Sequence, residues 1–141
     1  MTRIGRKKKK KRSRPKLPAL RILRNRLDKV FSKFIRKRDS DQDGNAKCVT
    51  CPRVLPWVEM QCGHWIKRQH AGTRWHELNC AAQCAVCNLY NSGRQDVFAG
   101  VLLEKYGADV VQELLRLKVE GKKHSRAELM NLIEDYSGDH Q

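Results

Sequence analysis

Apolar residues recur at three- and four-residue spacing between residues 19 and 38. They are Leu20, Leu23, Leu27, Val30, Phe31 and Phe34. This spacing predicts an amphipathic helix over 19–38. Most basic residues of the segment lie off this apolar stripe, namely Arg21, Arg24, Lys29, Lys33 and Arg36. We therefore expect the stripe to pack on the rest of the domain and the basic side to lie along a phosphate backbone.

Three further helical stripes follow Gly93, and they are separated by Gly107 and Gly121. Ser125 and Glu128 have the spacing of a capping box, which predicts that the last helix begins there. Residues 95–141 hold nine acidic and six basic residues. We therefore expect a helical extension that completes the core or meets a partner and does not touch DNA.

The middle of the chain is built from shorter apolar runs. Residues 46–62 predict a metal knuckle and a short hairpin strand, and 79–84 predict a second strand that leads into a helix bearing Asn88. The polar run Asp39–Gly44 resembles the opening of a calcium-binding loop, but Thr50 replaces the glutamate expected at its twelfth position. We interpret that run as a polar turn. Short strands among helices place the chain in the α+β class.

Charge divides the chain into two parts. Residues 1–38 hold 18 Lys and Arg residues and one acid, Asp28, whereas residues 39–141 hold 12 basic and 14 acidic residues. Such a basic block is typical of proteins that bind polyanions. We expect DNA contacts from the arm and the helix, made by Lys7, Lys8, Lys9, Lys10, Lys11, Arg24, Lys33 and Arg36. The alternatives are an anionic membrane surface for the helix and a merely solvated tail for the arm.

Four segments follow from these patterns. We predict a disordered basic arm over 1–18, a basic amphipathic helix over 19–38, a zinc-binding domain over 44–94 and a helical extension over 95–141. No apolar run approaches the roughly 20 residues that a membrane-spanning helix needs. The basic start lacks the apolar region of a secretory signal, so we expect a reducing cytoplasm and no membrane partner.

Two C-x-x-C knuckles indicate a metal site. Cys48, Cys51, Cys84 and Cys87 can supply four thiolates to one structural Zn²⁺ with no open coordination position. The 32 residues between the knuckles leave room for a sizeable insertion. The other two cysteines, Cys62 and Cys80, lack this spacing, and we interpret them as small buried residues with inert thiols.

Gly63-His64, Asn79 and Asn88 lie within and beside this cysteine frame. Hydrolysis of a phosphodiester needs a base for the attacking water and a cation for the leaving oxygen. Neutral His64 could be that base, Asn88 offers an oxygen to Mg²⁺ or Mn²⁺, and Asn79 could hold the loop that bears His64. The alternative is that His64 is a structural histidine or an outer neighbour of the zinc.

The ordered motifs resemble a known family. They are Cys48-x-x-Cys51, Gly63-His64, the run from Arg74 to Asn79, the run from Gln83 to Asn88, and Ser92-Gly93. The run from Phe31 to Asp39 and Tyr106-Gly107 agree with the same pattern. Together they are similar to the NinG (Rap) family of lambdoid phage recombination proteins, which resemble zinc-containing HNH (ββα-metal) endonucleases. The resemblance covers roughly residues 25–120.

This resemblance implies a small ββα-metal (HNH-like) core held by the four-cysteine zinc site and flanked by the N-terminal basic helix and the C-terminal helices. It implies metal-dependent cleavage of branched DNA, such as D-loops and Holliday junctions, in the cytoplasm of a bacterial host. By position, His64 would be the general base, Asn79 the middle HNH residue and Asn88 the metal ligand. Arg68 and Arg74 would hold phosphate.

One position departs from the pattern, because many HNH nucleases have an acidic metal ligand where this chain has Gly63. Glu59, Gln61, His70 or His76 could complete the metal shell. Two other functions stay open: a non-catalytic zinc-containing DNA-binding protein that recruits phage or host recombination proteins, and an HNH nuclease that cuts linear duplex. A homodimer would suit two symmetric cuts across a junction.

Overall fold

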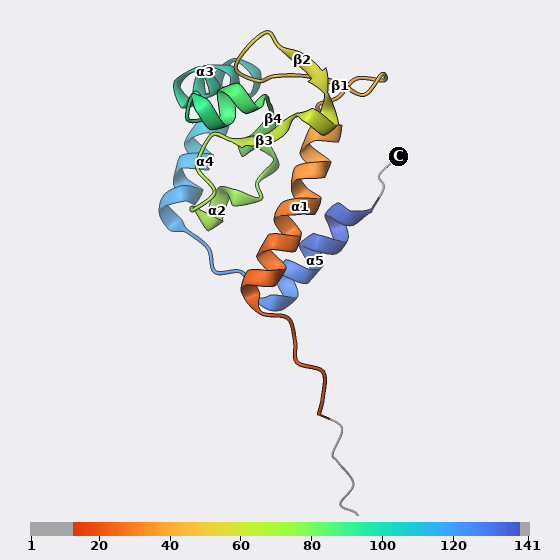
Figure 1. Cartoon of the computed structure of the whole chain (residues 1–141). Helices are drawn as coiled ribbons and strands as arrows, with labels where there is room; N and C mark the ends of the chain where they lie inside the picture. Colours follow the sequence, from red (N-terminus) through yellow and green to blue (C-terminus); the bar gives the residue numbers. More distant parts are fainter. Residues whose placement is uncertain (1–12, 139–141) are drawn as a thin grey trace, which may run out of the picture.

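The computed structural model describes residues 13–138 and shows an α+β fold of helices and two small antiparallel sheets, one of them at an edge of the molecule (Figure 1). The four strands are β1 (Asn45–Lys47), β2 (Val54–Pro56), β3 (Gln61–His64) and β4 (Cys80–Gln83). The longer helices are α1 (Leu20–Arg38), α3 (Gln95–Tyr106), α4 (Ala108–Glu120) and α5 (Arg126–Ser137). The predicted phosphate contacts at 7–11 lie outside the described residues.

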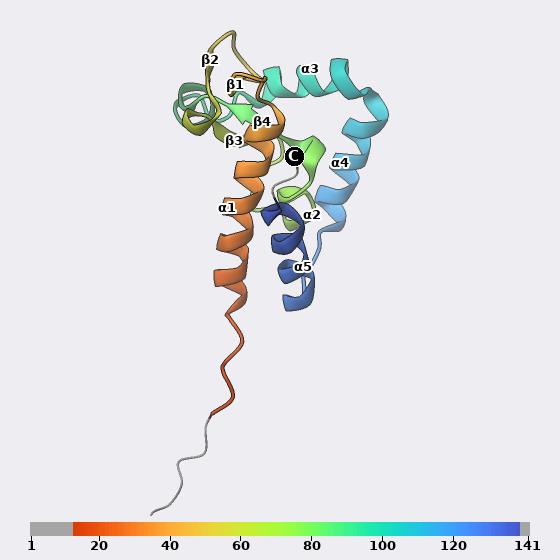
Figure 2. The same ribbon diagram turned by 90° about the vertical axis from the view of Figure 1, so that its right-hand side faces the viewer.

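Helix α1 buries its apolar stripe against α5, and the two helices lie side by side in both views (Figures 1 and 2). Leu23, Leu27 and Phe31 are buried as the spacing predicts, and Ile35 extends the stripe by one turn. Leu129 of α5 is fully buried in the same cluster, and the Tyr136 ring meets the Phe31 ring edge-on at 5.0 Å. The C-terminal extension therefore completes the core, the first of the two alternatives.

Strands β3 and β4 form the hairpin at the centre of the fold. Their register pairs Cys62 with Ala82 and His64 with Cys80. Because side chains alternate across a strand, Cys80 faces the α1–α5 cluster whereas Ala81 faces a second cluster with Phe98 and Leu102 of α3. The β3–β4 sheet therefore has a hydrophobic cluster on each of its two faces.

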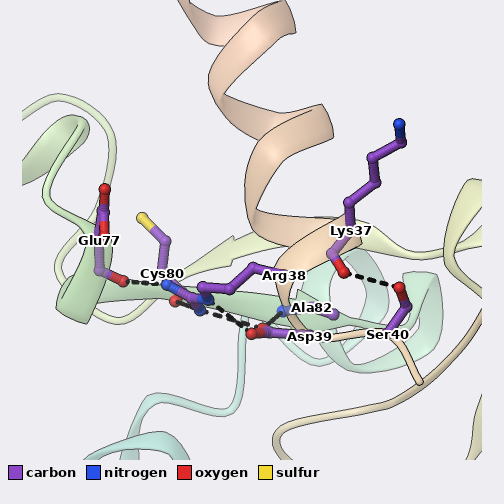
Figure 3. A network of polar contacts seen from close by, with 7 residues as sticks. All are labelled: Lys37, Arg38, Asp39, Ser40, Glu77, Cys80 and Ala82. Carbon is purple, nitrogen blue, oxygen red and sulfur yellow. Dashed lines mark hydrogen bonds and ion pairs between the residues drawn. The ribbon is translucent and has the colours of Figure 1, made fainter. Parts of the chain in front are cut away.

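A polar network fixes the end of α1 on β4 (Figure 3). The Arg38 guanidinium donates to the carbonyl oxygens of Glu77 and Cys80, at 2.9 and 2.8 Å. Asp39 accepts from the backbone N–H of Ala82 at 2.8 Å and from Arg38. These bonds set the position of α1 relative to the hairpin, and they explain why residues of α1 can line a cavity beside β3.

Local signals decide the remaining elements. In the predicted polar turn, a carboxylate oxygen of Asp41 accepts from the backbone N–H groups of Asp43 and Asn45. The positive φ of Gly107 and Gly121, 86° and 69°, ends α3 and α4 at the predicted breaks, and the Ser125–Glu128 capping box is present. The predicted helix with Asn88 is a single π-helical segment, η3 (Val86–Tyr90).

The segment between strands β3 and β4 contains one helical turn, α2 (Ala71–Arg74). Two 3₁₀ segments are η1 (Trp57–Glu59), before β3, and η2 (Glu77–Asn79), before β4. Among residues 13–138, no helix has the length and apolar character needed to cross a bilayer.

Candidate functional site

The two knuckles come together as one four-cysteine cluster. Cys48 and Cys51 lie in the turn between β1 and β2, and Cys84 and Cys87 follow β4. The four sulfur atoms lie within 4.8 Å of one another, and Cys51 Sγ is 3.8 Å from Cys84 Sγ. Four thiolates at this separation could hold a tetrahedral metal ion such as Zn²⁺.

Backbone and side-chain groups support this cluster from outside. The backbone N–H of Cys84 donates to Cys48 Sγ at 3.3 Å, and the Arg53 guanidinium approaches Cys84 Sγ at 3.7 Å. Burial opposes ionisation of the Cys48 thiol, but hydrogen bonds from the backbone of Cys84 and Thr50 lower its pKa to about 6. These hydrogen bonds therefore favour the thiolate at Cys48, the form that binds metal, whereas burial raises the pKa of Cys51 to about 12.

His64 and Asn88 line one cavity of about 730 Å³. Its walls come from α1, from β3 and the loop after it, and from the segment around η3. Of the four residues that could complete a metal shell, Gln61 alone lines this cavity. Glu59 lies in η1 outside the lining, His70 lines a separate cavity, and His76 accepts from the backbone N–H of Leu78. The structure therefore brings a histidine and two amide side chains to one opening.

The His64 imidazole is held in one tautomer. Its Nε2 lies 2.9 Å from the carbonyl oxygen of Arg74, and because a carbonyl can only accept, Nε2 must carry the proton and Nδ1 the lone pair. Burial lowers the pKa of His64 below its usual 6.5, and the backbone interactions with Arg74 and Cys62 only partly offset this effect. A neutral imidazole at physiological pH is suited to accept a proton.

Asn79 lies outside the cavity lining and is fully buried. Its Oδ1 accepts from the backbone N–H of Ile66 at 2.8 Å, and its Nδ2 donates to the carbonyl oxygens of Ile66 and Thr73 at 3.0 and 3.1 Å. These bonds tie the end of η2 to Ile66, two residues after His64, and to Thr73 of α2. Asn79 is therefore placed to position the loop after His64 and not to touch a substrate.

Asn88 and Gln61 are paired across the cavity. Asn88 Nδ2 donates to Gln61 Oε1 at 2.7 Å, which leaves Oδ1 of Asn88 as its remaining acceptor. Such an amide oxygen is a ligand type that Mg²⁺ and Mn²⁺ accept. Both amides are neutral, so these two side chains alone would hold a hard cation only weakly.

Gly63 has no room for a side chain. A Cβ atom at this position would lie 2.3 Å from Gln83 Oε1 and 2.8 Å from Gln83 Cβ. Gln83 is fully buried and donates through Nε2 to Thr50 Oγ1 and to the Gly93 carbonyl, at 2.9 and 2.8 Å. Gln83 therefore occupies the space that the side chain of an acidic residue at position 63 would need.

Asp28 of α1 joins the helix to the His64 loop. Its carboxylate accepts from the Arg74 guanidinium at 3.0 and 2.5 Å and from Trp75 Nε1 at 2.9 Å, and Arg68 lies 3.8 Å away. The Arg74 carbonyl in turn accepts from His64. Asp28 lines the cavity too, yet its negative charge is balanced by these cations.

The predicted DNA contacts fall into different settings. Arg24 and Lys33 are exposed on α1. Arg68 is 63% exposed at the cavity. Arg36 lines the cavity too, but its guanidinium packs over the Trp57 ring at 5.3 Å, and the Arg74 guanidinium is bound by Asp28.

Sequence reasoning did not select Asp28 or Lys67 as site residues, although both line the cavity. Asp28 has one signal in the sequence, because it is the only acid in a segment of 18 cations. A single acid among so many cations is expected to pair with a basic side chain inside the protein. Lys67 has no comparable signal.

Comparison with known proteins agrees with this arrangement of motifs. The family described as Bacteriophage Lambda NinG protein matches residues 1–141. The chain is 29% identical over 109 residues to Protein ninG of Escherichia phage lambda, an alignment that covers 72% of this chain and 51% of that protein. It is 33% identical over 82 residues to Protein ninG of Salmonella phage P22, which covers 57% and 38%.

The chain thus matches about half or less of the length of these two relatives. No solved structure matches it. Because the family match extends over the whole chain and includes both knuckles, His64 and both asparagines, this protein belongs to the NinG family of bacteriophage proteins.

Proposed function

We propose that this protein is a metal-dependent endonuclease that cuts branched DNA, such as D-loops and Holliday junctions, during phage recombination. One observation supports the proposal above the others. His64, a half-buried histidine with a lowered pKa, and Asn88, an amide with a free acceptor, line one cavity whose other walls include Arg36, Lys67 and Arg68. A base, an oxygen ligand and cations are the groups that phosphodiester hydrolysis needs.

His64 is proposed as the general base. Nδ1 accepts a proton from the attacking water, while Nε2 keeps its proton and its bond to the Arg74 carbonyl. That carbonyl stabilises the imidazolium formed when the proton is taken. Asn79 keeps the loop after His64 in place through its three bonds to Ile66 and Thr73, so it acts as a positioning residue.

Asn88 is proposed to hold a catalytic Mg²⁺ or Mn²⁺ through Oδ1, with Gln61 fixing the orientation of its amide. When bound, such an ion would neutralise charge on the phosphate and the leaving oxygen. The neutral donors suit a hard cation only when DNA supplies phosphate oxygens. We therefore expect the ion to bind together with DNA and not to the free protein.

The order of elements supports an HNH-like core. Strand β3 ends at His64, β4 returns beside it, and η3 with Asn88 follows directly after the second knuckle. We propose that this hairpin and η3 form the ββα-metal unit and that the four-cysteine zinc site holds them together.

DNA is proposed to lie along α1 and across the cavity. Arg24 and Lys33 offer exposed cations on α1, and Arg68 and Lys67 are exposed at the cavity. The basic arm over 1–18 would add phosphate contacts through counterion release. Branched substrates, recombination partners and a dimer are proposals that rest on membership of a phage recombination family.

Cleavage of a labelled four-way junction and of its matched linear duplex tests the proposal. Wild type, His64→Ala and the control His70→Ala are compared in Mg²⁺ and in EDTA. We expect junction cleavage that requires Mg²⁺, is lost in His64→Ala and is retained in His70→Ala, whose side chain lines a separate cavity.

Two other outcomes would decide for the alternatives. Equal cleavage of the duplex would indicate an HNH nuclease for linear DNA. Tight binding of both substrates by wild type and His64→Ala, with no cleavage in any metal, would overturn the proposal and favour a DNA-binding recruitment protein.

A further inference from the structure

Three metal-binding side chains meet on one face of the central hairpin. Cys62 and His64 are two residues apart on β3, and Cys80 is the cross-strand partner of His64 on β4. Because alternate side chains share a face, all three project to the side that packs against α1. One sulfur atom from each cysteine and one ring nitrogen lie within 4.8 Å of one another.

Among the described residues this is the second cluster of its kind, and it is separate from the four knuckle cysteines. Cys80 is 2% exposed within the α1–α5 core, while Cys62 is half-buried and lines the same cavity as His64. One side of the three-residue group is covered by the α1–α5 core, and the other side faces the cavity. A bound ion would therefore have three protein ligands and one position open to solvent.

The donor chemistry selects the ion. Two sulfur atoms and an imidazole are soft ligands that favour Zn²⁺ over Mg²⁺ or Mn²⁺. Zinc–sulfur bonds of about 2.3 Å and zinc–nitrogen bonds of about 2.0 Å place tetrahedral ligands roughly 3.4–3.8 Å apart. Atoms within 4.8 Å reach this spacing with side-chain adjustments on the order of 1 Å.

His64 is oriented as metal-bound histidines usually are. Such histidines commonly donate their second ring N–H to a backbone carbonyl, which fixes the ring. Here Nε2–H donates to the Arg74 carbonyl, the same group that lies 3.9 Å from Cys80 Sγ. The tautomer that leaves Nδ1 able to accept a proton also leaves Nδ1 able to bind a metal ion.

We propose that Cys62, His64 and Cys80 form a second, reversible Zn²⁺ site that inhibits this protein. The inhibitory part rests on the proposed nuclease function, because an ion bound to His64 occupies the lone pair that would accept a proton from water. The site has fewer thiolates than the knuckle cluster. It fills only after the structural ion is in place, and it makes cleavage sensitive to free zinc.

Metal counting tests the site without reference to cleavage. The full chain with its structural zinc is dialysed against buffered free Zn²⁺ under reducing conditions, and bound zinc per chain is measured. We expect two ions in wild type at saturation and one in Cys62→Ser and Cys80→Ala. The control Ser32→Ala changes a residue of the same cavity outside the ligand set, and it should keep two.

Cobalt provides the matching spectroscopic signature. Co²⁺ added to wild type should give a second sulfur-to-cobalt absorption band that is absent in Cys62→Ser. A single ion in wild type, or a second ion that persists in both cysteine variants, would overturn the site.

Inhibition is measured as the junction-cleavage rate in Mg²⁺ with added Zn²⁺, divided by the zinc-free rate of the same protein. We expect at least a tenfold fall in wild type at zinc levels that fill the second site, and less than a twofold fall in Cys62→Ser. Equal inhibition of both would refute the inhibitory role. If wild type never cleaves, the proposed function fails while metal counting still decides the site.

Discussion

The Nε2 of His64 lies 2.9 Å from the carbonyl oxygen of Arg74. Arg74 also binds Asp28 of α1 through its guanidinium, so one residue links the imidazole to the basic helix. This link connects a segment of high positive charge, 46 residues earlier in the chain, with the group proposed to accept a proton. A shift of α1 would therefore move Arg74, and with it the carbonyl oxygen that His64 contacts.

The partial burial of His64 leads to a pH prediction. Burial lowers its pKa below 6.5, so the acidic limb of the kcat/KM profile for junction cleavage should have its midpoint below pH 6.5. In the unfolded chain this histidine binds a proton more readily than in the folded protein. Its contribution to the stability of the folded protein is therefore lost as the pH falls below 6.5. NMR titration of His64 should give the same midpoint, and a value above 6.5 would contradict the burial argument.

Asp28→Asn should loosen the link between α1 and the His64 loop. The change removes the charge that balances Arg74 at a site where both side chains are at most 20% exposed. We expect a loss of about 1–3 kcal/mol in the free energy of unfolding, measured with urea. The control Asp43→Asn, in an exposed turn, should change it by less than about 0.5 kcal/mol. Equal effects would show that the Asp28 ion pair is not stabilising.

Asn79→Ala should leave the buried N–H and carbonyl of Ile66 without their side-chain partner, while the Thr73 carbonyl keeps its bond from the His76 N–H. We expect a destabilisation of about 2–4 kcal/mol and faster hydrogen exchange at Ile66. The matched variant Asn91→Ala removes an exposed asparagine and should have little effect on either measurement. Unchanged exchange at Ile66 would show that Asn79 does not hold this loop.

Gly63→Ala should clash with Gln83, because the new Cβ would lie 2.3 Å from Gln83 Oε1. We expect a cost of about 1–3 kcal/mol, and a smaller cost when Gln83 is already alanine. A double-mutant cycle by urea unfolding measures this coupling. Additive effects would mean that the Gln83 amide, which alanine lacks, is not the reason for glycine at this position.

Removal of the structural ion should unfold the knuckles. The β1–β2 hairpin is tied to β4 by the four-cysteine cluster and by the bond from Val49 N–H to the Ala82 carbonyl. A strong zinc chelator should lower the Tm by at least roughly 15 °C. Cys62→Ser retains the knuckle cysteines and should respond in the same way. An unchanged Tm after verified zinc loss would rule out a structural role for the ion.

The sequence determined the features that depend on near neighbours in the chain. The three- and four-residue spacing predicted α1, the glycines 107 and 121 predicted the ends of α3 and α4, and Ser125 with Glu128 predicted the start of α5. Helix periodicity, caps and left-handed glycine conformations act within about one turn. The C-x-x-C spacing within each knuckle is local too, and it predicted the four-cysteine cluster, although the two knuckles meet only through the tertiary structure.

Tertiary structure decided which of several similar residues share the cavity. Arg68 and Arg74 were equivalent as cations, but Asp28 binds the Arg74 guanidinium and leaves Arg68 largely exposed. Gln61 became the partner of Asn88, Gln83 filled the space beside Gly63, and Cys62 and Cys80 met at His64. These contacts join residues from different elements, so they depend on strand register and on how α1 packs against β3 and β4, which no local pattern specifies.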